Sequence, residues 1–396
     1  MYVNPSLRNI VPCIVTLGLF ACGDDANTEP EPLNDEQEVR RLLNLPDRLA
    51  TPHIPEYNPL TAEKIELGRH LFYDPRLSVN ETTSCASCHE QHLAFADGEK
   101  NPMGATGEVH PRNSQGLANV AYNATLTWAN DGLLLLEDQI QVPLRADNPI
   151  ELGITDGVRE MVLARFDDDP DYAQMFAAAF PESDSGATVN KIAFALASFV
   201  RTMISVSSPY DRFLAGESDA LTEQQKQGLA LFNGERFECF HCHSGTLFTT
   251  SYRDANTTEG TFRTPFFNNG LYNIGNAGDY PEHNQGLYDL TFNPEDRGLF
   301  RPPSLRNVEL TEPYMHDGSI ATLREVVEHY AAGGRVIEEG PFAGDGRLNP
   351  NKSGLVRGFQ ATDEELDAVV AFLEALTDPE FITNPAFSDP FAEPQP

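Results

Sequence analysis

Hydrophobic residues recur every three or four positions in several separate stretches of the 396-residue chain, with irregular segments rich in Gly, Pro and Asn between them. This spacing places the apolar side chains on one side of an α-helix. It is found before Phe72, at about 158–166, over 189–203, over 322–332 and after Thr362. A sustained alternation of apolar and polar residues, which would indicate strands, is not found. The sequence therefore predicts a mainly α fold with long irregular loops.

Capping residues mark where several of these helices begin. Thr61 precedes the helix that contains Ile65, Leu67 and Leu71, and its hydroxyl can accept a hydrogen bond from a free backbone N–H of the first turn. Elsewhere a Thr is followed three residues later by Gln or Glu, which is a capping box. These boxes are Thr222-x-x-Gln225, Thr322-x-x-Glu325 and Thr362-x-x-Glu365.

Two of the predicted helices share a longer pattern. Leu60-Thr61, followed by Gly68-x-x-Leu71-Phe72, returns as Leu221-Thr222, followed by Gly228-x-x-Leu231-Phe232. Internal self-similarity indicates that one structural unit occurs twice. We therefore expect two tandem domains, at 39–205 and 206–396, with the last segment packing back on the first of them.

The N-terminus has the features of a lipoprotein-type signal peptide over residues 1–21. Arg8 precedes an apolar run from Ile10 to Phe20, which is too short to span a bilayer. Leu19-Phe20-Ala21-Cys22 resembles a bacterial lipobox, so Cys22 would be lipidated; a plain signal peptide cut nearby is the alternative. Either interpretation predicts an exported protein, periplasmic and, if Cys22 is lipidated, anchored to the membrane. Residues 22–38 are polar and acidic and predict a flexible tether.

Four of the six cysteines lie in two C-x-x-C-H motifs, one in each predicted domain. In such a motif the two thiols attach covalently to a haem, and the adjacent histidine ligates its iron. A zinc site would need further cysteines, and the other two, Cys13 and Cys22, fall in or at the end of the signal segment. We therefore expect two covalent c-type haems and no structural disulfide. The motif residues are Cys85, Cys88 and His89, and Cys239, Cys242 and His243.

The charge of the chain excludes some classes of partner. Sixty Asp and Glu residues against 27 Lys and Arg give a formal net charge of −33. Such a chain is repelled by nucleic acid and by anionic membrane surfaces, so neither is expected as a partner. Membrane association is expected only through a lipid anchor. A basic or copper-loaded partner protein is compatible with this charge, although an acidic surface also occurs without any partner.

Further motifs resemble the bacterial dihaem cytochrome c peroxidase/MauG superfamily from about Leu60 to Phe391. The resemblance implies an exported oxidoreductase that reacts with hydrogen peroxide and has two cytochrome-c-like domains with one haem each. Besides the haem motifs, it is carried by four stretches in the same order. These are Leu71-Phe72-Tyr73-Asp74-Pro75-Arg76-Leu77-Ser78, Arg112-Asn113, Pro303-Ser304-Leu305-Arg306-Asn307-Val308 and Pro313-Tyr314-Met315-His316-Asp317-Gly318.

The resemblance also bears on the second axial ligand of the C-terminal haem. In the electron-fed peroxidases of this family, that ligand is a methionine after the His-Asp-Gly motif, and Tyr330 occupies the corresponding place here. Tyrosine at this place resembles MauG, and an anionic phenolate stabilises high-valent iron better than a thioether. Met315 and His329 are the alternatives, with Tyr330 then a packed aromatic residue.

At the N-terminal haem, peroxidases that need reductive activation place a distal histidine where this chain has about Ala105. His92 and His110 lie nearby and are the alternatives for a distal iron ligand, although each is expected to be a loop residue instead. The resemblance thus implies a site open to peroxide under the 91–111 loop. The family's pocket glutamine, proline and glutamate match Gln139, Pro143 and Glu151, with Glu151 as the acid/base that moves the peroxide proton. A solvated loop carboxylate is the alternative for Glu151.

The family pattern assigns roles to further residues between the haems. Trp128, the only tryptophan, would carry oxidising equivalents from one haem to the other, although an isolated tryptophan is more often a core residue. Asn113, Thr311 and Pro313 match positions that surround a calcium ion through neutral oxygen donors. Asn113 as a simple turn cap is the alternative.

Segments 126–130, 136–144 and 149–153 resemble the MbnH branch, the MauG-like enzymes associated with methanobactin and MbnP proteins. This implies a high-valent dihaem state that oxidises a tryptophan of an MbnP-like copper-binding protein to kynurenine by long-range electron transfer. A peroxidase supplied with electrons by a soluble cytochrome or cupredoxin is the alternative enzyme. A pure electron carrier is a third hypothesis and would need two coordinatively saturated haem irons.

Overall fold

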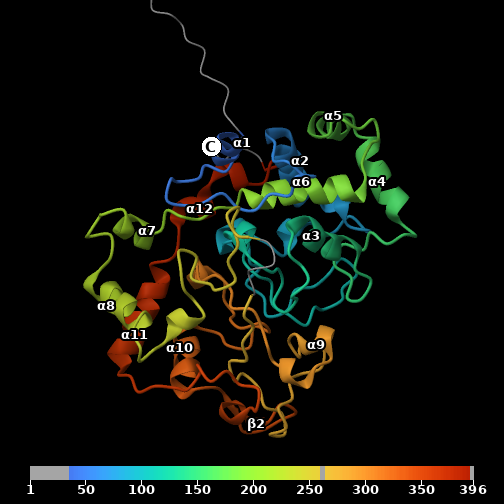
Figure 1. Ribbon diagram of the computed structural model, residues 1–396. Coiled ribbons are helices and arrows are strands. Elements are labelled where there is room, and N and C mark those ends of the chain that lie inside the picture. Colours follow the sequence, from blue (N-terminus) through green and yellow to red (C-terminus); the bar gives the residue numbers. More distant parts are fainter. Residues whose placement is uncertain (1–34, 259–263, 393–396) are drawn as a thin grey trace, which may run out of the picture.

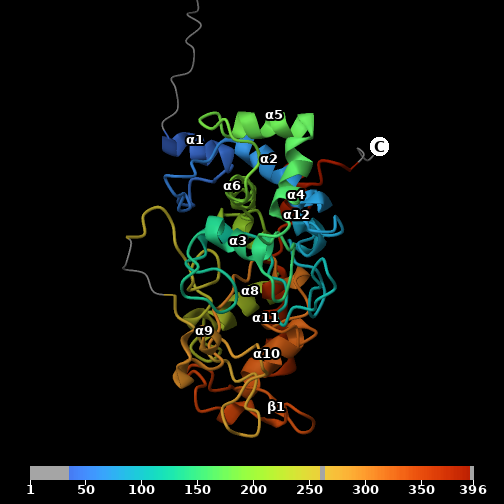
Figure 2. The same cartoon turned by 90° about the vertical axis from the view of Figure 1, so that its right-hand side faces the viewer.

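The computed structural model describes residues 35–258 and 264–392, and the predicted signal peptide with Cys22 lies outside them. The molecule is elongated, and two perpendicular views agree on the arrangement of its halves (Figures 1 and 2). Helices from the first half of the chain form one end, and most of those from the second half lie toward the other. The α-helices are α1 Asp35–Leu42, α2 Ala62–Tyr73, α3 Leu136–Arg145, α4 Arg159–Asp167, α5 Pro170–Ala179, α6 Val189–Arg201, α7 Pro209–Leu214, α8 Glu223–Phe232, α9 Tyr288–Thr291, α10 Leu323–Ala332, α11 Asp363–Glu374 and α12 Pro379–Thr383.

The remaining regular structure is short. One two-stranded antiparallel sheet pairs β1 Val336–Ile337 with β2 Gly344–Asp345. Among the residues described, no helix has the length and apolar character needed to cross a membrane. The 3-10 helices are η1 Pro75–Leu77, η2 Cys85–Ser87, η3 Gln91–Leu93, η4 Val120–Tyr122, η5 Cys239–His241, η6 Pro294–Asp296, η7 Val308–Leu310, η8 Gly346–Leu348 and η9 Pro385–Phe387.

Each half of the chain has its own cluster of buried hydrophobic residues, built on one close helix pair. In the first half α2 packs on α6, and a Cβ added at Gly68 would lie 2.0 Å from the carbonyl oxygen of Ala195. In the second half α8 packs on α11, and a Cβ at Gly228 would lie 1.8 Å from the carbonyl oxygen of Ala368. Only glycine allows such approach of two helix backbones. The repeated Gly-x-x-Leu-Phe pattern therefore reflects the same helix contact made twice.

The end of the chain returns to the first half. Phe381 of α12 and Phe387 of η9 are buried in the first hydrophobic cluster and pack edge-on against Phe95. Gln91 donates a hydrogen bond to the carbonyl oxygen of Asn384, and the Tyr73 hydroxyl donates one to that of Phe387. In Figure 1 the red segment with α12 lies beside α1, α2 and α6. The N-terminal cluster is thus completed by the last elements of the chain.

The predicted helix starts are confirmed, and one boundary differs from expectation. Thr61, Thr222, Thr322 and Thr362 each accept a hydrogen bond from a first-turn N–H. However, α1 begins at Asp35, inside the range predicted as a tether. Acidic residues in its first turn and two arginines in its last suit the helix dipole, which explains a helix in so polar a segment.

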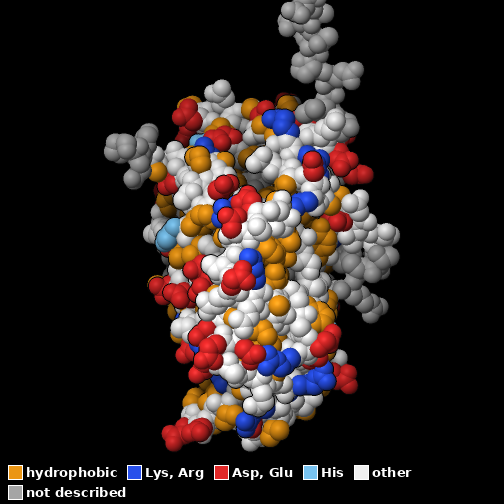
Figure 3. All heavy atoms as spheres, turned by 90° about the vertical axis from the view of Figure 1, so that its left-hand side faces the viewer, with side chains coloured by type: hydrophobic (Ala, Val, Ile, Leu, Met, Phe, Trp, Pro, Cys, Tyr) orange, Lys and Arg blue, Asp and Glu red, His pale blue; other side chains and the backbone are white. Residues whose placement is uncertain are grey.

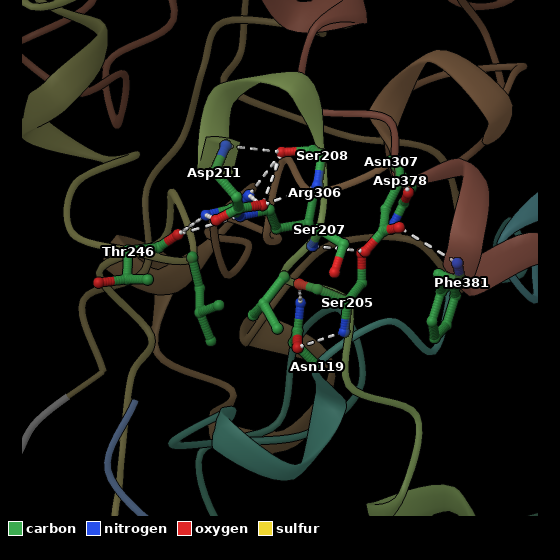
Figure 4. A network of polar contacts seen from close by, with 12 residues as sticks. Asn119, Ser205, Ser207, Ser208, Asp211, Thr246, Arg306, Asn307, Asp378 and Phe381 are labelled. Carbon is green, nitrogen blue, oxygen red and sulfur yellow. Dashed lines mark hydrogen bonds and ion pairs between the residues drawn. The ribbon is translucent and has the colours of Figure 1, made fainter. Parts of the chain in front are cut away.

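A buried polar network joins the linker between the halves to both of them (Figure 4). Ser205 pairs through its backbone N–H with the side chain of Asn119, and its hydroxyl donates to Asp378. Six residues on, Asp211 forms a salt bridge to Arg306 at 2.6 Å, with both side chains almost fully buried. The network therefore fixes the linker against segments from both ends of the chain.

This network yields a prediction about stability. Although burial alone would raise the pKa of Asp211, the charge of Arg306 and hydrogen bonds from Ser208, Arg306 and Arg48 lower it. The stabilisation is present above the ordinary carboxyl pKa of about 4 and is lost as pH falls through the lowered value. Replacing Asp211 with Asn leaves Arg306 buried without a counter-charge. We expect the free energy of unfolding at neutral pH to fall by about 3–5 kcal/mol.

Urea unfolding of the wild type and Asp211→Asn at neutral pH and near pH 3 measures this effect. The difference between the two proteins should shrink at the acidic pH, where the wild-type carboxyl begins to take up a proton. Asp47→Asn is the control because Asp47 is fully exposed and its carboxylate lies 3.8 Å from Arg40, which makes the pair weak. The free energy of unfolding should change by less than about 1 kcal/mol in this variant. An equal loss in both variants would contradict the role given to the buried pair.

Candidate functional site

The two C-x-x-C-H motifs fold into the same local structure. Both begin with a short 3-10 helix, η2 in one and η5 in the other, and none of the four cysteines is paired in a disulfide with another described residue. His89 Nδ1 lies 2.7 Å from the carbonyl oxygen of Phe95, and His243 Nδ1 lies 3.1 Å from that of Phe248. A ring that donates from Nδ1 keeps a lone pair on Nε2, the atom that ligates iron. Burial lowers the pKa of both histidines, which favours the neutral ligand form.

Each motif opens onto a large cavity. The first, about 510 Å³, is lined by Cys85, Cys88 and His89, together with residues of the 102–111 loop and α3. The second, about 260 Å³, is lined by Cys239, Cys242 and His243 and by residues of α10. The thiols and the histidine of each motif therefore lie on one cavity wall, as covalent attachment and ligation of a single haem require.

The second cavity also has a group suited to the haem carboxylates. Arg301 lines it and is almost fully buried, and its Nη1 has no hydrogen-bond partner among the described residues. Burial lowers the pKa of Arg301 to about 10, so the guanidinium stays charged at neutral pH. A buried cation without a counter-charge is unfavourable, and a propionate of a haem would provide one. This residue was not singled out from the sequence, in which it is only one of the arginines of the second half.

Trp128 forms part of the wall of both cavities. Its indole N–H donates to the carbonyl oxygen of Asn113 at 2.8 Å, and its own carbonyl oxygen accepts from the backbone N–H of Arg301. The ring is therefore held between segments from both halves of the chain. The sequence-based expectation that Trp128 lies between the haem sites agrees with this placement, while its redox role stays a prediction.

Gln139, Pro143 and Glu151 all line the first cavity. Gln139 and Pro143 are four residues apart on α3 and so share one side of the helix. Glu151 follows α3 and is half-buried; burial raises the pKa of its carboxyl, and the charge of the neighbouring His110 opposes this. A carboxyl on a cavity wall whose pKa is raised is suited to general acid/base work. The structure thus brings together the three residues assigned to the peroxide pocket.

The histidines near the first haem motif are placed differently from one another. His92 is exposed, with 70% of its side chain accessible, and does not line the cavity. His110 does line it, beside Glu151. Ala105 donates its backbone N–H to the carbonyl oxygen of Glu151 and contributes no ligand atom. Of the two histidines, only His110 is part of the pocket, which the sequence left undecided.

Three side chains were considered for the far side of the second haem, and two of them line its cavity. Tyr330 and Met315 are lining residues, whereas His329 is not and its Nε2 lies 3.1 Å from the carbonyl oxygen of Asn269. Met315 Sδ accepts a hydrogen bond from the Asn269 side chain. Burial raises the pKa of Tyr330 to about 12, so a phenolate there requires a cation such as ferric iron next to the oxygen.

We expect Tyr330→Phe to leave both haems attached and to change the low-spin signal of the diferric protein, because the oxygen donor is removed while the ring is kept. The electron paramagnetic resonance spectrum measures this directly. Tyr57→Phe, at an exposed tyrosine, should leave the spectrum unchanged. An unchanged low-spin signal in Tyr330→Phe would transfer the ligand assignment to Met315.

The residues assigned to calcium also come together. Asn113, Thr311 and Pro313 all line the second cavity, and Asn113 lines the first as well. The Asn113 side-chain nitrogen donates to the carbonyl oxygen of Glu99 at 2.8 Å, which leaves its side-chain oxygen as the ligand atom. Neutral side-chain and carbonyl oxygens of this kind suit Ca²⁺. Calcium at this point stays a prediction.

One other group within the described residues has metal-ligand spacing. Ligand atoms of Glu235, Glu238 and His241 lie within 4.8 Å of one another. Both carboxylate oxygens of Glu238 accept hydrogen bonds from Arg357, however. We therefore attribute this cluster to surface charge pairing.

Comparison with known proteins identifies the family. The sequence profile of di-haem cytochrome c peroxidase matches residues 62–219. Cytochrome-c peroxidase IdrP1 of Pseudomonas sp. (strain SCT) is 36% identical over 342 residues, which cover 82% of this chain and 83% of that protein. The chain belongs to the dihaem cytochrome c peroxidase/MauG family. Proteins of this family carry two c-type haems, which fits the two motifs and cavities described above.

Two further relatives refine the position of this dihaem peroxidase. The methylamine utilization protein MauG of Methylorubrum extorquens is 32% identical and covers 85% of this chain and 84% of its own. The crystal structure of a MauG-like protein associated with microbial copper homeostasis superposes with a TM-score of 0.86. That protein is 46% identical, and the match covers 88% of this chain and 99% of the other. The present protein is thus a haem-dependent oxidoreductase that acts with peroxide.

Proposed function

We propose that this enzyme uses hydrogen peroxide to oxidise a tryptophan of a partner protein, an MbnP-like copper-binding protein, by electron transfer over a long distance. The observation that carries the proposal is Trp128, which belongs to the walls of both haem cavities. The 46% identity to a MauG-like protein of copper homeostasis supports the class of partner. Tyr330 in the second cavity, in place of the methionine of electron-fed peroxidases, supports a MauG-like reaction.

In this proposal, residues of the first cavity act on peroxide, and Trp128 connects that cavity to the second. Bound haem supplies the iron that accepts electrons singly and reacts with peroxide. Glu151 moves a proton from one oxygen of hydrogen peroxide to the other, so that the second oxygen leaves as water. Gln139 and Pro143 shape the space above the peroxide. Trp128 conducts electrons between the two sites, so the substrate never has to enter a cavity.

The overall reaction balances with peroxide alone. Conversion of tryptophan to N-formylkynurenine removes four electrons and adds two oxygen atoms, and two molecules of hydrogen peroxide account for both while two molecules of water leave. Hydrolysis then releases formate and gives kynurenine.

A second candidate function is reduction of peroxide with electrons from a cytochrome or cupredoxin, which is favoured by the similarity to cytochrome-c peroxidases. A pure electron carrier is excluded by the enzyme family.

The surface is compatible with a protein partner that approaches from outside. In the view of Figure 3, acidic side chains are scattered over the whole face and are not gathered at one place. The net charge of −33 favours a basic or neutral contact surface on the partner. We further propose a periplasmic location with a lipid anchor at Cys22, which would bring the enzyme to exported partners.

Two measurements test the proposed function. The diferric protein as isolated should show one high-spin and one low-spin haem, since peroxide needs an open iron. The co-encoded partner, incubated with this enzyme and peroxide, should gain the mass expected for conversion of tryptophan to kynurenine. If no partner residue changes mass while a reduced cytochrome is rapidly oxidised, the second candidate is correct.

A further inference from the structure

The loop that covers the first haem cavity folds as a small hairpin over residues 102–110. Met103 and Val109 form an isolated antiparallel bridge, and the backbone N–H of Gly104 donates to the carbonyl oxygen of Glu108. At the base, the N–H of His110 donates to the carbonyl oxygen of Pro102 at 2.9 Å. The position of His110 is therefore set by the hairpin and not by a free loop.

The hairpin is fixed to the segment that carries Glu151. Ala105 donates its N–H to the Glu151 carbonyl oxygen at 2.8 Å, and the Ile150 N–H donates to a Glu108 carboxylate oxygen at 2.6 Å. A Cβ added at Gly104 would lie 1.7 Å from the carbonyl oxygen of Ile150, so only glycine permits this contact. These contacts hold His110 and Glu151 in one relative position on the cavity wall.

His110 faces Glu151 in a defined way. Its side chain is only 12% exposed, its Nδ1 lies 3.7 Å from a carboxylate oxygen of Glu151, and its Nε2 lies 3.3 Å from the carbonyl oxygen of Ile150. Because a carbonyl oxygen only accepts, Nε2 must carry the hydrogen. The neutral ring therefore presents the Nδ1 lone pair to Glu151, and the protonated ring presents an N–H. At 3.7 Å the two atoms are in close contact but are not hydrogen-bonded, and a small rotation of the carboxyl would bring them into hydrogen-bond range.

We propose that His110 is a positioning and proton-exchange residue of the peroxide site, which holds the carboxyl of Glu151 in place and passes protons to it from solvent. This inference rests on the assignment of Glu151 to the peroxide step. Reduction of hydrogen peroxide to two molecules of water consumes two electrons and two protons. The electrons come from the protein side chain or redox donor that the enzyme oxidises, and the two protons enter through His110 and Glu151.

Other charged or titratable groups also lie near His110 and Glu151. Glu108 is exposed and accepts a hydrogen bond from the Ile150 N–H, and Arg112 is paired at 2.7 Å with Asp289, which lines the same cavity. His283 also lines the cavity but is exposed. Since Arg112 is neutralised by Asp289, His110 is the group placed to exchange a proton with Glu151 within the covered part of the pocket.

The experiment uses the full-length enzyme with both haems and measures turnover of peroxide over a pH range. His110→Gln keeps a polar side chain and removes the ionisable ring. We expect a turnover about 10 to 100 times slower, less than loss of the acid/base itself would cause, and a pH profile with one ionisation fewer. His92→Gln, an exposed histidine of the same loop, should stay within about twofold of the wild type.

Because His110 is proposed to act through Glu151, the double variant His110→Gln/Glu151→Gln should be no slower than Glu151→Gln alone. Additive losses would overturn the proposal, as would an unchanged rate and pH profile in His110→Gln while Glu151→Gln is slow. If Glu151→Gln itself is silent, the Glu151 assignment fails instead. Should His110→Gln not retain both haems in its absorption spectrum, His110→Asn is measured in its place against the same outcomes.

Discussion

Glu151→Gln should slow the reaction of the diferric enzyme with hydrogen peroxide by ~10²–10⁴-fold, the usual range for a positioned acid/base. Glutamine keeps the shape of the side chain and its place on the cavity wall but cannot take up and return a proton. Burial raises the pKa of Glu151 above that of an ordinary carboxyl, which favours the protonated form that can give a proton to peroxide. Stopped-flow mixing with peroxide measures the rate of this step directly.

Glu99→Gln provides the matched control for this prediction. Glu99 is an exposed carboxylate of the same covering loop and does not line the first cavity. Its replacement should leave the peroxide rate within about twofold of the wild type. A loss smaller than threefold in Glu151→Gln would show that this carboxylate is not the proton shuttle. The comparison is valid only if the variant keeps the haem spectrum of the wild type.

Trp128→Phe should abolish modification of the partner protein while the first haem still reacts with peroxide. Phenylalanine fills most of the same space between the cavities but is much harder to oxidise than tryptophan. It also lacks the N–H that donates to the carbonyl oxygen of Asn113. The partner is incubated with peroxide and each enzyme, and its mass is then measured.

Trp128→Tyr separates a redox role from a packing role. Tyrosine can be oxidised, although less easily than tryptophan, so part of the partner modification should return in this variant. A merely structural Trp128 would give similar results with Phe and Tyr. Full activity of Trp128→Phe on the partner would require another path for electrons between the two sites.

Much of the fold follows from local signals in the sequence. The helices after Thr61, Thr222, Thr322 and Thr362 were predicted because each begins with a cap and continues with regular apolar spacing. By contrast, α3 was not predicted, and Pro143 inside it is the residue that argues against a helix there. Pro143 has no N–H to donate to the carbonyl oxygen of Gln139, four residues earlier. The start of α5 at Pro170 after the cap Asp169 is a signal that could have been used.

In the candidate site, too, some features can be predicted from the sequence and others depend on how the chain folds. Haem attachment at the two C-x-x-C-H motifs is a local signal, and the family resemblance supplied Gln139, Pro143, Glu151, Trp128 and Tyr330. The contact between His110 and Glu151 joins residues that are far apart in the chain, and it depends on how the 102–110 hairpin packs on Ile150. Nothing in the spacing of these residues reveals it. The same is true of Arg301, whose burial decides its importance.

The return of α12 to the first half of the chain has a consequence for biogenesis. Phe381 and Phe387 contact Phe95, whose carbonyl oxygen holds the ring of His89. The chain is synthesised from its N-terminus, so these two aromatic rings are made last. The surroundings of the first C-x-x-C-H motif therefore cannot close until nearly the whole polypeptide has been made. Cys85 and Cys88 should stay accessible to haem attachment until then, and a chain truncated before Phe381 should mature with its first haem site unfinished.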